Sequence, residues 1–527
     1  MYKILIADKL SQKGIDLINS TEGFEAVVKT GISEEELSSI IGDYDGLIVR
    51  SATQLTEKVL ENPGRLKGVA RAGVGVDNIN IPEATRKGVL VMNTPGGNTL
   101  SAAEHTMALM LSLSRNVVPA CVKMKSGGWD RKLYVGNQLN NKVLGVIGLG
   151  RIGMAVIRMA AGFNMKIVGY DPFSIPTQAE NFGVEITDSL EEIYKKADFI
   201  TMHIPRNKNT ENLISKEQLE MMKPTARIVN CARGGIINEN DLYDALENNV
   251  IAGAALDVYN EEPPENRRFE NLDNCLVTPH LGASTEEAQI GVALEAAEVL
   301  MDSIKGGPIK NAINAPAVSE SAPKIIKSYS ELARKVGRLM NVLKAGRIKK
   351  VVLEYRGTIA NEDVTPLKTS FSIGLLQPNF DVQVNIVNAG FLARERGISI
   401  DEVKNEDCTN FSSCFTAKVS TEIGNYSVTG TLFDDNIMKI VSINGYETEF
   451  TPAGLIMLAL YRDRPGVIGS IGTACGKYDI NIGTMSVGRK DGKAMMALSL
   501  DQNLGKEAQG ALDEVDSVEK YTVCDFD

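Results

Sequence analysis

The chain contains 527 residues, of which 43% are hydrophobic and 23% are charged, and its formal net charge is −11. This length is too great for a single hydrophobic core and predicts three or four domains. The acidic balance disfavours nucleic acid and anionic membranes as partners, and no apolar run reaches the roughly 18 residues that a membrane span needs.

The cysteines and histidines limit the chemistry further. Seven cysteines are scattered without a C-x-x-C pair, and there are three histidines. This number and spacing of cysteines and histidines predict free thiols. They predict no metal site, because zinc centres need clustered ligands. The first residues lead directly into a predicted strand rather than into a signal peptide, which favours a cytoplasmic location.

Short apolar strands alternate with helical stretches in residues 1–97. The strands are expected at 4–7, 47–49, 69–70 and 89–92. This alternation predicts a small parallel α/β lobe.

A glycine-rich turn between two predicted strands is the most specific motif of the chain. Residues 143–147 read as a buried strand, the turn 148–153 follows at once, and a helix is expected over 154–161. A second strand, 166–170, ends on Asp171. Strand, G-x-G-x-x-G turn, helix, strand and acid in this order are typical of a dinucleotide-binding unit, although a turn without ligand has the same bare pattern.

The glycines of this turn have separate expected roles. Gly148 allows the tight turn, Gly150 lets the backbone approach a pyrophosphate, and Gly153 lets the helix pack close to the sheet. The helix N-terminus offers free N–H groups to the phosphates. The Asp171 carboxylate would accept hydrogen bonds from ribose hydroxyls and repel a 2′-phosphate, which predicts NAD rather than NADP.

Three further residues follow strands in the same unit. Arg233 comes after the predicted strand 228–231, Glu262 after 254–258, and His280 after Thr278-Pro279. Loops that follow parallel strands share one edge of a sheet, so all three side chains could meet at the cofactor. Histidine suits removal of a hydroxyl proton, a carboxylate orients its ring, and arginine binds a substrate carboxylate. Each alone could instead be structural.

The chain changes character after residue 283. Ser284 and Glu287 fit a capping box for a helix that ends near 304. The pattern over 312–452 is richer in strands, with a strand at 426–433, a turn at Asp434-Asp435-Asn436 and a hairpin signal at Asn444-Gly445. Residues 453–527 read as βαββαβ, a ferredoxin-like order.

The segments around the three candidate catalytic residues resemble the signatures of D-2-hydroxyacid dehydrogenases. They are 230–235, 255–259, 261–263 and 278–283. The resemblance implies that Arg233, Glu262 and His280 are catalytic. Further cofactor contacts are assigned to Arg151, Ile152, Cys231, Ala232, Asp257 and Ala283.

The chain is similar, more closely still, to the D-3-phosphoglycerate dehydrogenase branch of this family. Residues 71–78 resemble its substrate loop, whose backbone N–H groups would hold a carboxylate. Residues 50–53 resemble a second anion-binding segment, and 128–132 one that reaches the substrate phosphate in a neighbouring subunit. The substrate residues so implied are Arg50, Ser51, Arg71, Gly73, Val74, Gly75 and Arg131.

The layout also resembles the long form of that branch. The implied architecture is two Rossmann-like lobes, a substrate lobe (1–97 and 284–311) and an NAD-binding domain (98–283), followed by an α+β intervening allosteric domain (312–452) and an ACT domain (453–527). Asp463 and Asn481 resemble the ACT site for the feedback inhibitor L-serine, although Asp463 could simply begin a β-turn. A basic set in the intervening domain could be an anion pocket or a solvated face: Arg356, Lys368, Arg394 and Arg396.

The resemblance implies NAD-dependent oxidation of D-3-phosphoglycerate to 3-phosphohydroxypyruvate, the first step of L-serine biosynthesis, by a homodimer or homotetramer. One alternative is another enzyme of the family, such as a glyoxylate or hydroxypyruvate reductase. The other is an NAD-sensing interaction protein without catalysis, because a fold does not fix a function.

Overall fold

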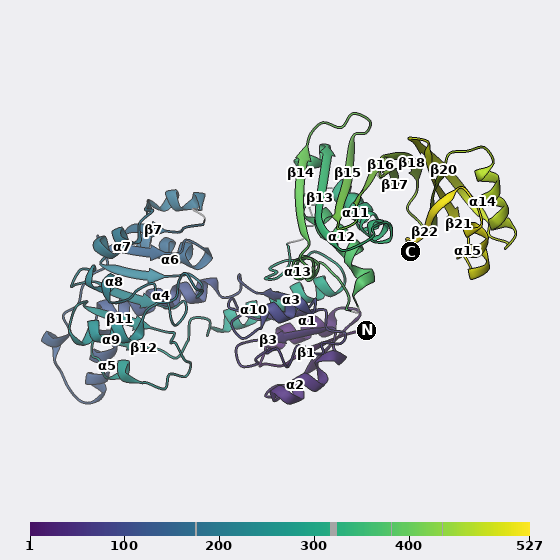
Figure 1. Cartoon of the computed structure of the whole chain (residues 1–527). Helices are drawn as coiled ribbons and strands as arrows, with labels where there is room; N and C mark the ends of the chain where they lie inside the picture. The colour runs from purple at the N-terminus through teal and green to yellow at the C-terminus, as the bar shows by residue number, and fades with distance from the viewer. Residues whose placement is uncertain (174–175, 317–323, 381, 435) are drawn as a thin grey trace.

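The computed structural model describes residues 1–173, 176–316, 324–380, 382–434 and 436–527. Figure 1 shows four units in a bent row, with the nucleotide-binding lobe at one end and the C-terminal unit at the other. None of the helices in these ranges is long and apolar enough to cross a membrane.

The first lobe is a five-stranded parallel sheet in the order β2-β1-β3-β4-β5. Its elements are β1 (Tyr2–Ile6), α1 (Gln12–Ser20), β2 (Phe24–Val28), α2 (Glu34–Ile40), β3 (Gly46–Val49), β4 (Gly68–Arg71), α3 (Ile81–Arg86) and β5 (Leu90–Asn93). The four predicted strands are confirmed. The sequence analysis missed β2, an edge strand with a weaker apolar pattern and only one buried residue, Phe24.

Helix α10 (Glu286–Ile304) returns the chain to this lobe, and it buries Val292, Ala296 and Leu300 in the same core as the strands. The prediction that Ser284 caps it is wrong. Thr285 is the N-cap residue, and its hydroxyl accepts a hydrogen bond from the Ala288 N–H at 3.2 Å. Ser284 instead belongs to the preceding turn, because its N–H donates to the Leu281 carbonyl.

The second lobe is a seven-stranded parallel sheet in the order β12-β11-β10-β9-β6-β7-β8. Its strands are β6 (Val143–Ile147), β7 (Lys166–Tyr170), β8 (Glu185–Ile186), β9 (Phe199–Met202), β10 (Arg227–Asn230), β11 (Gly253–Leu256) and β12 (Cys275–Val277). Its helices are α4 (Thr99–Ser114), α5 (Val117–Lys125), α6 (Arg151–Gly162), α7 (Leu190–Lys196), α8 (Lys216–Glu220) and α9 (Glu239–Glu247). The strand order reverses between β6 and β9, and ligands bind such sheets at this point.

The third unit is more helical than we predicted. Its sheet, in the order β14-β13-β15-β16-β17-β18, packs against a 20-residue helix, α11 (Lys324–Leu343). The other elements are β13 (Ile348–Gly357), α12 (Thr365–Leu376), α13 (Ala389–Glu395), β14 (Ser399–Asn405), β15 (Ser413–Thr421), β16 (Asn425–Phe433), β17 (Ile437–Ile443) and β18 (Tyr446–Phe450). The hairpin at Asn444-Gly445 is confirmed, with φ of 52° and 79°. Asp435 of the predicted turn lies outside the described residues.

The C-terminal unit confirms the predicted βαββαβ order. It consists of β19 (Leu455–Arg462), α14 (Val467–Gly476), β20 (Ile482–Lys490), β21 (Lys493–Leu500), α15 (Lys506–Asp513) and β22 (Val518–Asp525), with sheet order β20-β21-β19-β22. Along β19, Met457 and Ala459 lie in the core under the helices, whereas Ile456 and Leu458 lie in the core of the third unit. The last two units therefore share buried apolar surface.

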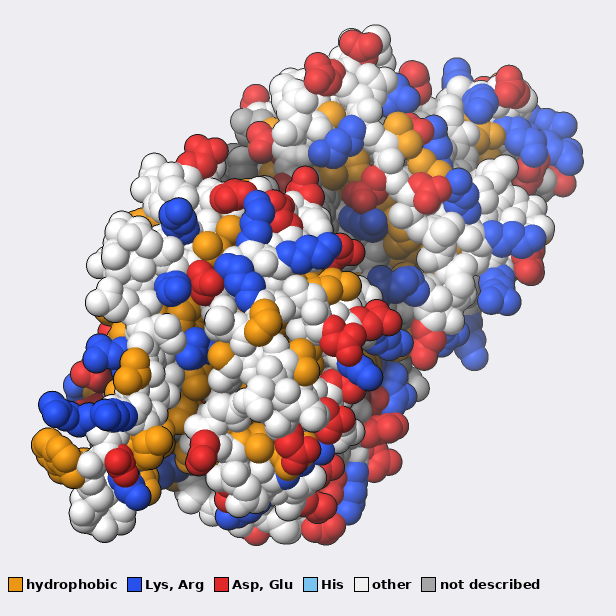
Figure 2. Space-filling view, turned by 90° about the vertical axis from the view of Figure 1, so that its left-hand side faces the viewer, with side chains coloured by type: hydrophobic (Ala, Val, Ile, Leu, Met, Phe, Trp, Pro, Cys, Tyr) orange, Lys and Arg blue, Asp and Glu red, His pale blue; other side chains and the backbone are white. Residues whose placement is uncertain are grey.

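Six short 3-10 segments complete the described secondary structure: Ile41–Asp43, Arg131–Tyr134, Thr177–Phe182, Arg268–Asn271, Thr358–Asn361 and Gln377–Asn379. Figure 2 looks onto the nucleotide-binding end of the molecule. Acidic and basic side chains are interspersed on this face, so the net negative charge does not form a single-sign field there.

Candidate active site

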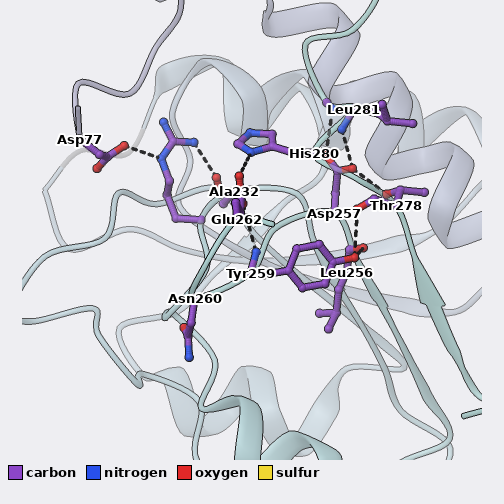
Figure 3. Close-up of polar contacts among 12 residues, drawn as sticks. Asp77, Ala232, Leu256, Asp257, Tyr259, Asn260, Glu262, Thr278, His280 and Leu281 are labelled. Atoms are coloured by element: carbon purple, nitrogen blue, oxygen red, sulfur yellow. Dashed lines mark hydrogen bonds and ion pairs between the residues drawn. The ribbon is translucent and has the colours of Figure 1, made fainter. Parts of the chain in front are cut away.

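A histidine and a glutamate form a close pair where the loops after β11 and β12 meet. His280 Nδ1 lies 2.6 Å from Glu262 Oε2, and 45% and 36% of the two side chains are exposed (Figure 3). Partial burial would raise the pKa of Glu262, but the hydrogen bond and charge of His280 lower it on balance. Glu262 is therefore an anion at neutral pH, and the ring nitrogen Nε2 of His280 is the one that can exchange a proton with a ligand.

Two arginines, one from each lobe, lie near each other, and Arg233 is also close enough to Glu262 to act on its charge. Arg233, after β10, contacts Asp77 at 3.2 Å and donates to the Ala232 carbonyl at 2.6 Å (Figure 3). Arg71, at the end of β4, is largely buried, and its Nε has no hydrogen-bond partner among the described residues. Burial, and then repulsion from Arg233, lower the pKa of Arg71 to about 10. Two neighbouring cations of this kind favour an anionic ligand between them.

The guanidinium groups lie close against the two glycines of the 73–75 loop. A Cβ atom at Gly73 would lie 1.5 Å from Arg71 Nη1, and one at Gly75 would lie 1.8 Å from Arg233 Nη2. Val74 stands between them, and its carbonyl accepts a hydrogen bond from Asn93 at 2.6 Å. The loop and both arginines therefore form one cradle.

The second predicted anion-binding segment lies beside the first. Asn78 Nδ2 donates to the carbonyls of Arg50 (2.8 Å) and Thr53 (2.6 Å), which ties the segment 50–53 to the end of the substrate loop. Asp8, after β1, accepts the Arg50 N–H at 2.5 Å. Ser51 is exposed. Sequence reasoning missed Asp8, although it follows a strand just as the catalytic candidates do, whereas Asn78 lies within the predicted substrate loop 71–78.

The glycine-rich turn has the geometry that a dinucleotide needs. Gly148 has a φ of +94°, and a Cβ at Gly153 would lie 2.0 Å from the Gly148 carbonyl oxygen, so the helix packs directly on the turn. A Cβ at Gly150 meets no atom within 4 Å, which leaves the backbone open to a ligand. These observations fit a pyrophosphate over the start of the twelve-residue helix α6.

A cavity of about 600 Å³ opens at this turn, lined in part by Gly150, Arg151 and Asp171. The Asp171 carboxylate accepts N–H hydrogen bonds from Leu149 and Phe173, each at 2.9 Å. It therefore supports the turn from the end of β7, where an adenosine ribose would lie. Ile152 is in the first turn of α6, half-buried against the core of this lobe.

The remaining predicted cofactor residues line the carboxyl ends of β10 to β12. Cys231 and Ala232 follow β10, and Ala283 lies in the turn before α10. Asp257 is fully buried, and protein donors surround its carboxylate: Thr278, Leu281, Gly282 and His105. The contact of Asp257 with the cofactor stays a prediction, because its carboxylate already accepts hydrogen bonds from the loop that carries His280 and lies 3.1 Å from His105 Nε2.

Comparisons with known proteins show the family of the chain. Residues 107–282 match the family model of the D-isomer specific 2-hydroxyacid dehydrogenase NAD-binding domain, and residues 325–444 match that of the D-3-phosphoglycerate dehydrogenase intervening domain. A D-3-phosphoglycerate dehydrogenase of Synechocystis sp. is 41% identical over 99% of this chain and 95% of that protein. That of Bacillus subtilis is 40% identical over the full length of both. The chain belongs to the D-3-phosphoglycerate dehydrogenase family.

The fold of the first two lobes is shared more widely. A glyoxylate reductase from Paecilomyes thermophila superposes with a TM-score of 0.55 and 26% identity, over 59% of this chain and 98% of that one. The family assignment makes NAD the cofactor of this glycine-rich turn and the enzyme an NAD-dependent oxidoreductase.

Arg131 is exposed on a surface rich in apolar side chains. It begins the short segment 131–134. Seven apolar residues of 117–135 are about half exposed or more: Val117, Val118, Val122, Met124, Trp129, Leu133 and Val135. A patch of this kind on a single chain is typical of an interface.

The two predicted serine-binding residues do not meet within one chain. Asp463 follows β19, at the end of the sheet where Arg462 opposes Lys493, and it pairs with Arg489 at 3.3 Å. Asn481 precedes β20 at the opposite end, where Ile482 opposes Leu500, and it donates to Asp501 at 2.7 Å. Seven residues of strand separate the two ends by roughly 20 Å.

Two of the four basic residues predicted as an anion pocket or a solvated face pair with carboxylates. Arg356 contacts Glu354 at 3.3 Å, Lys368 contacts Glu402 at 2.8 Å, and Arg396 lies 4.6 Å from the ring centre of Phe380. Arg394 is exposed in the last turn of α13. This arrangement favours the solvated face over the anion pocket.

Proposed function

We propose that this chain oxidises D-3-phosphoglycerate to 3-phosphohydroxypyruvate with NAD, and so begins L-serine biosynthesis. The observation that carries the proposal is the His280–Glu262 pair next to two arginines at the cofactor edge of the sheet. NAD supplies the hydride acceptor when bound. His280 Nε2 takes the hydroxyl proton, and the Glu262 anion stabilises the resulting imidazolium.

The charged groups of the cleft suggest how the substrate is oriented. The substrate carboxylate would lie on the 73–75 loop between Arg71 and Arg233. Arg233 would also polarise the developing carbonyl. The phosphate would lie toward Arg50 and Ser51. Both anions are then held before the proton and hydride leave, which lowers the entropic part of the barrier.

A second copy of the chain would complete this site. The exposed apolar surface of residues 117–135 supports a dimer in which Arg131 reaches the phosphate of the neighbouring subunit. Light scattering of the Trp129→Ser variant tests this proposal, because loss of this anchor should shift the protein toward the monomer. The C-terminal units could join dimers into a tetramer.

L-serine is the proposed effector of the C-terminal unit. The separation of Asp463 from Asn481 in one chain supports a site shared between two copies, each giving one residue. Asp463→Ala should remove serine inhibition and leave turnover intact. This variant is a better test than deletion of residues 453–527, since deletion would expose the core shared with the third unit.

The alternative enzyme is a glyoxylate or hydroxypyruvate reductase, which the similarity to the Paecilomyes thermophila protein supports. An NAD-sensing protein would bind the cofactor without turnover. A panel of D-3-phosphoglycerate, glyoxylate and hydroxypyruvate with NAD and NADP, with and without serine, separates the three by the absorbance of the reduced cofactor. The free cysteines fit the proposed cytoplasmic location, where thiols stay reduced.

A further inference from the structure

Of the two histidines that the proposed mechanism does not use, His105 and His203, His105 is the one that contacts Asp257. It lies on α4, about four-fifths of its side chain is buried, and Nε2 is 3.1 Å from Asp257 Oδ1 and 3.3 Å from Thr278 Oγ1. With hydrogen on Nε2, the ring donates to the buried carboxylate. This contact joins α4 to the loop after β12.

Asp257 in turn organises the turn that carries His280. Its carboxylate accepts the Leu281 N–H at 2.7 Å and the Gly282 N–H at 2.8 Å, and its backbone carbonyl accepts the His280 N–H at 2.9 Å. His280 has a φ of 54°, a left-handed conformation that costs energy for a residue with a side chain. The charge of Asp257 therefore offsets the strain that orients the catalytic ring.

Burial by itself would raise the pKa of Asp257, but hydrogen bonds from His105, Thr278 and Leu281 lower it below its usual value. The titratable groups around this carboxylate are His105 on α4, Cys231 after β10, Tyr259 after β11 and His280 itself. Without His105, the carboxylate would lose a side-chain donor and take up a proton at higher pH. A protonated Asp257 is a weaker acceptor for the Leu281 and Gly282 N–H groups.

The cluster could also be considered as a metal site, because ligand atoms of His105, Cys231 and Asp257 lie within 4.8 Å of one another. Burial raises the pKa of the Cys231 thiol to about 12, and the carboxylate is already surrounded by protein donors. The hydrogen-bond network explains all of these contacts without an ion.

We propose that His105 is a positioning residue for the oxidation: through Asp257 it keeps the 278–282 turn, and hence the His280 ring, in its working orientation. The expected effect on kcat rests on the proposed function, whereas the expected effect on the orientation of the His280 ring does not. Two variants separate the donor from the bulk of the side chain. His105→Gln keeps a donor near the position of Nε2, whereas His105→Leu removes it.

We expect His105→Leu to lower kcat about tenfold, with little change in KM and with a loss that deepens as the pH falls. His105→Gln should restore kcat to within about threefold and restore the pH profile. Glu104→Gln, an exposed neighbour on the same helix, is the matched control and should behave as wild type. Equal pH profiles for the Leu and Gln variants would overturn the proposal.

A second readout needs no substrate. The chain has three histidines, so NMR spectra of histidine-labelled protein can be assigned by substitution. The His280 resonance should move in His105→Leu and stay near its wild-type position in His105→Gln. An unmoved resonance in the Leu variant overturns the inference. A wild-type protein that does not turn over D-3-phosphoglycerate overturns the proposed function instead.

A separate observation concerns two thiols in the third unit. Cys408 Sγ lies 3.5 Å from Cys414 Sγ. Cys414 is buried at the start of β15, which is anchored because the Ser413 carbonyl accepts hydrogen bonds from Tyr329 (2.8 Å) and Thr431 (2.6 Å). Cys408 is half-buried in the loop before this strand. The sulfur atoms need to approach by about 1.5 Å to reach bonding distance, which a loop can allow.

We infer that Cys408 and Cys414 form an oxidation site that hydroperoxides convert to a disulfide. Hydrogen peroxide oxidises Cys408 to a sulfenic acid and leaves as water. The Cys414 sulfur then attacks that sulfur, the S–S bond forms, and the hydroxyl leaves with the thiol proton as a second water. Two thiols and one peroxide therefore give one disulfide and two waters.

Mass spectrometry of the intact enzyme after peroxide treatment and alkylation in denaturant tests this step. Both cysteines fall in one tryptic peptide, residues 405–418, which after oxidation should carry no alkyl group, weigh two hydrogens less than the unalkylated dithiol peptide, and become alkylatable at both thiols after dithiothreitol. In Cys408→Ser, Cys414 should stay alkylatable. Cys121 is exposed and serves as the internal standard. If Cys121 is oxidised while both thiols of the pair are still alkylated, the inference is wrong.

Discussion

The arginines around the 73–75 loop and the basic residues of the third unit differ in burial and in how closely two cations approach each other. At the loop, Arg71 is largely buried next to Arg233, and burial and repulsion together lower its pKa to about 10, although Asp77 lies 3.2 Å from Arg233. In the third unit, Glu354 lies next to Arg356, and Glu402 next to Lys368. The first arrangement is unfavourable for an isolated chain, whereas the second is an ordinary partly exposed set of ion pairs.

This difference supports the proposed substrate site more directly than charge counts do. Like charges held close together cost stability unless an anion joins them, so such an arrangement is expected where a ligand binds. Glycines at 73 and 75 keep the space for the two guanidinium groups. Arg356 instead lies 3.3 Å from the carboxylate of Glu354.

The largest expected effect is at the base in the cleft. His280→Ala should lower kcat about a thousandfold, because the hydroxyl proton loses its acceptor and Glu262 its partner. NAD binding, followed by quenching of protein fluorescence, should change little, since the glycine-rich turn is untouched. Turnover within tenfold of wild type would show that another group takes the proton.

The two classes of arginine give the most direct test of the comparison. Arg233→Ala should lower kcat/KM about a hundredfold, because both substrate binding and carbonyl polarisation are lost. Arg356→Ala removes an equal charge from an existing ion pair and should change kcat/KM less than about twofold. Steady-state kinetics with D-3-phosphoglycerate measure both. Similar losses for the two variants would make the third unit part of the substrate site.

A methyl group in the cradle should act next in size. Gly75→Ala places a Cβ 1.8 Å from Arg233 Nη2, so the guanidinium has to move. We expect KM for the substrate to rise about tenfold, with an unchanged melting temperature. Gly510→Ala in α15 meets no atom within 4 Å and is the control, with unchanged KM. An unchanged KM in Gly75→Ala would separate Arg233 from carboxylate binding.

The last expected effect is on stability against acid rather than on turnover. Burial lowers the pKa of His203 to about 4. All three histidines precede residue 281, so none lies in the C-terminal half of the chain. Between pH 6.5 and 4 the unfolded chain therefore binds a proton that the folded chain does not. Stability falls as the pH drops through this range, by at most about 3 kcal/mol. His203→Gln should flatten the pH dependence of the catalytic half in calorimetry and leave the C-terminal half unaffected.

Local patterns predicted some elements well and others poorly. Asn444-Gly445 and the turn 148–153 were recognisable because their backbone conformations need glycine or asparagine. Ser284 was wrong as a cap because Thr285 next to it caps equally well, and the preceding turn decides between them. Helix α11 was missed, although its apolar face is strong, because the strands around it dominated our interpretation.

The sequence by itself determined which residues follow the strands of the nucleotide sheet, and hence that Arg233, Glu262 and His280 share an edge. Strand order, parallel pairing and turn chemistry are local enough for a pattern to specify them. Only the tertiary structure decided that His105 reaches Asp257, that Arg71 and Arg233 meet across two lobes, and that Asp463 and Asn481 do not meet. These contacts join residues far apart in the chain, and their distances depend on how whole elements pack, which no local spacing encodes.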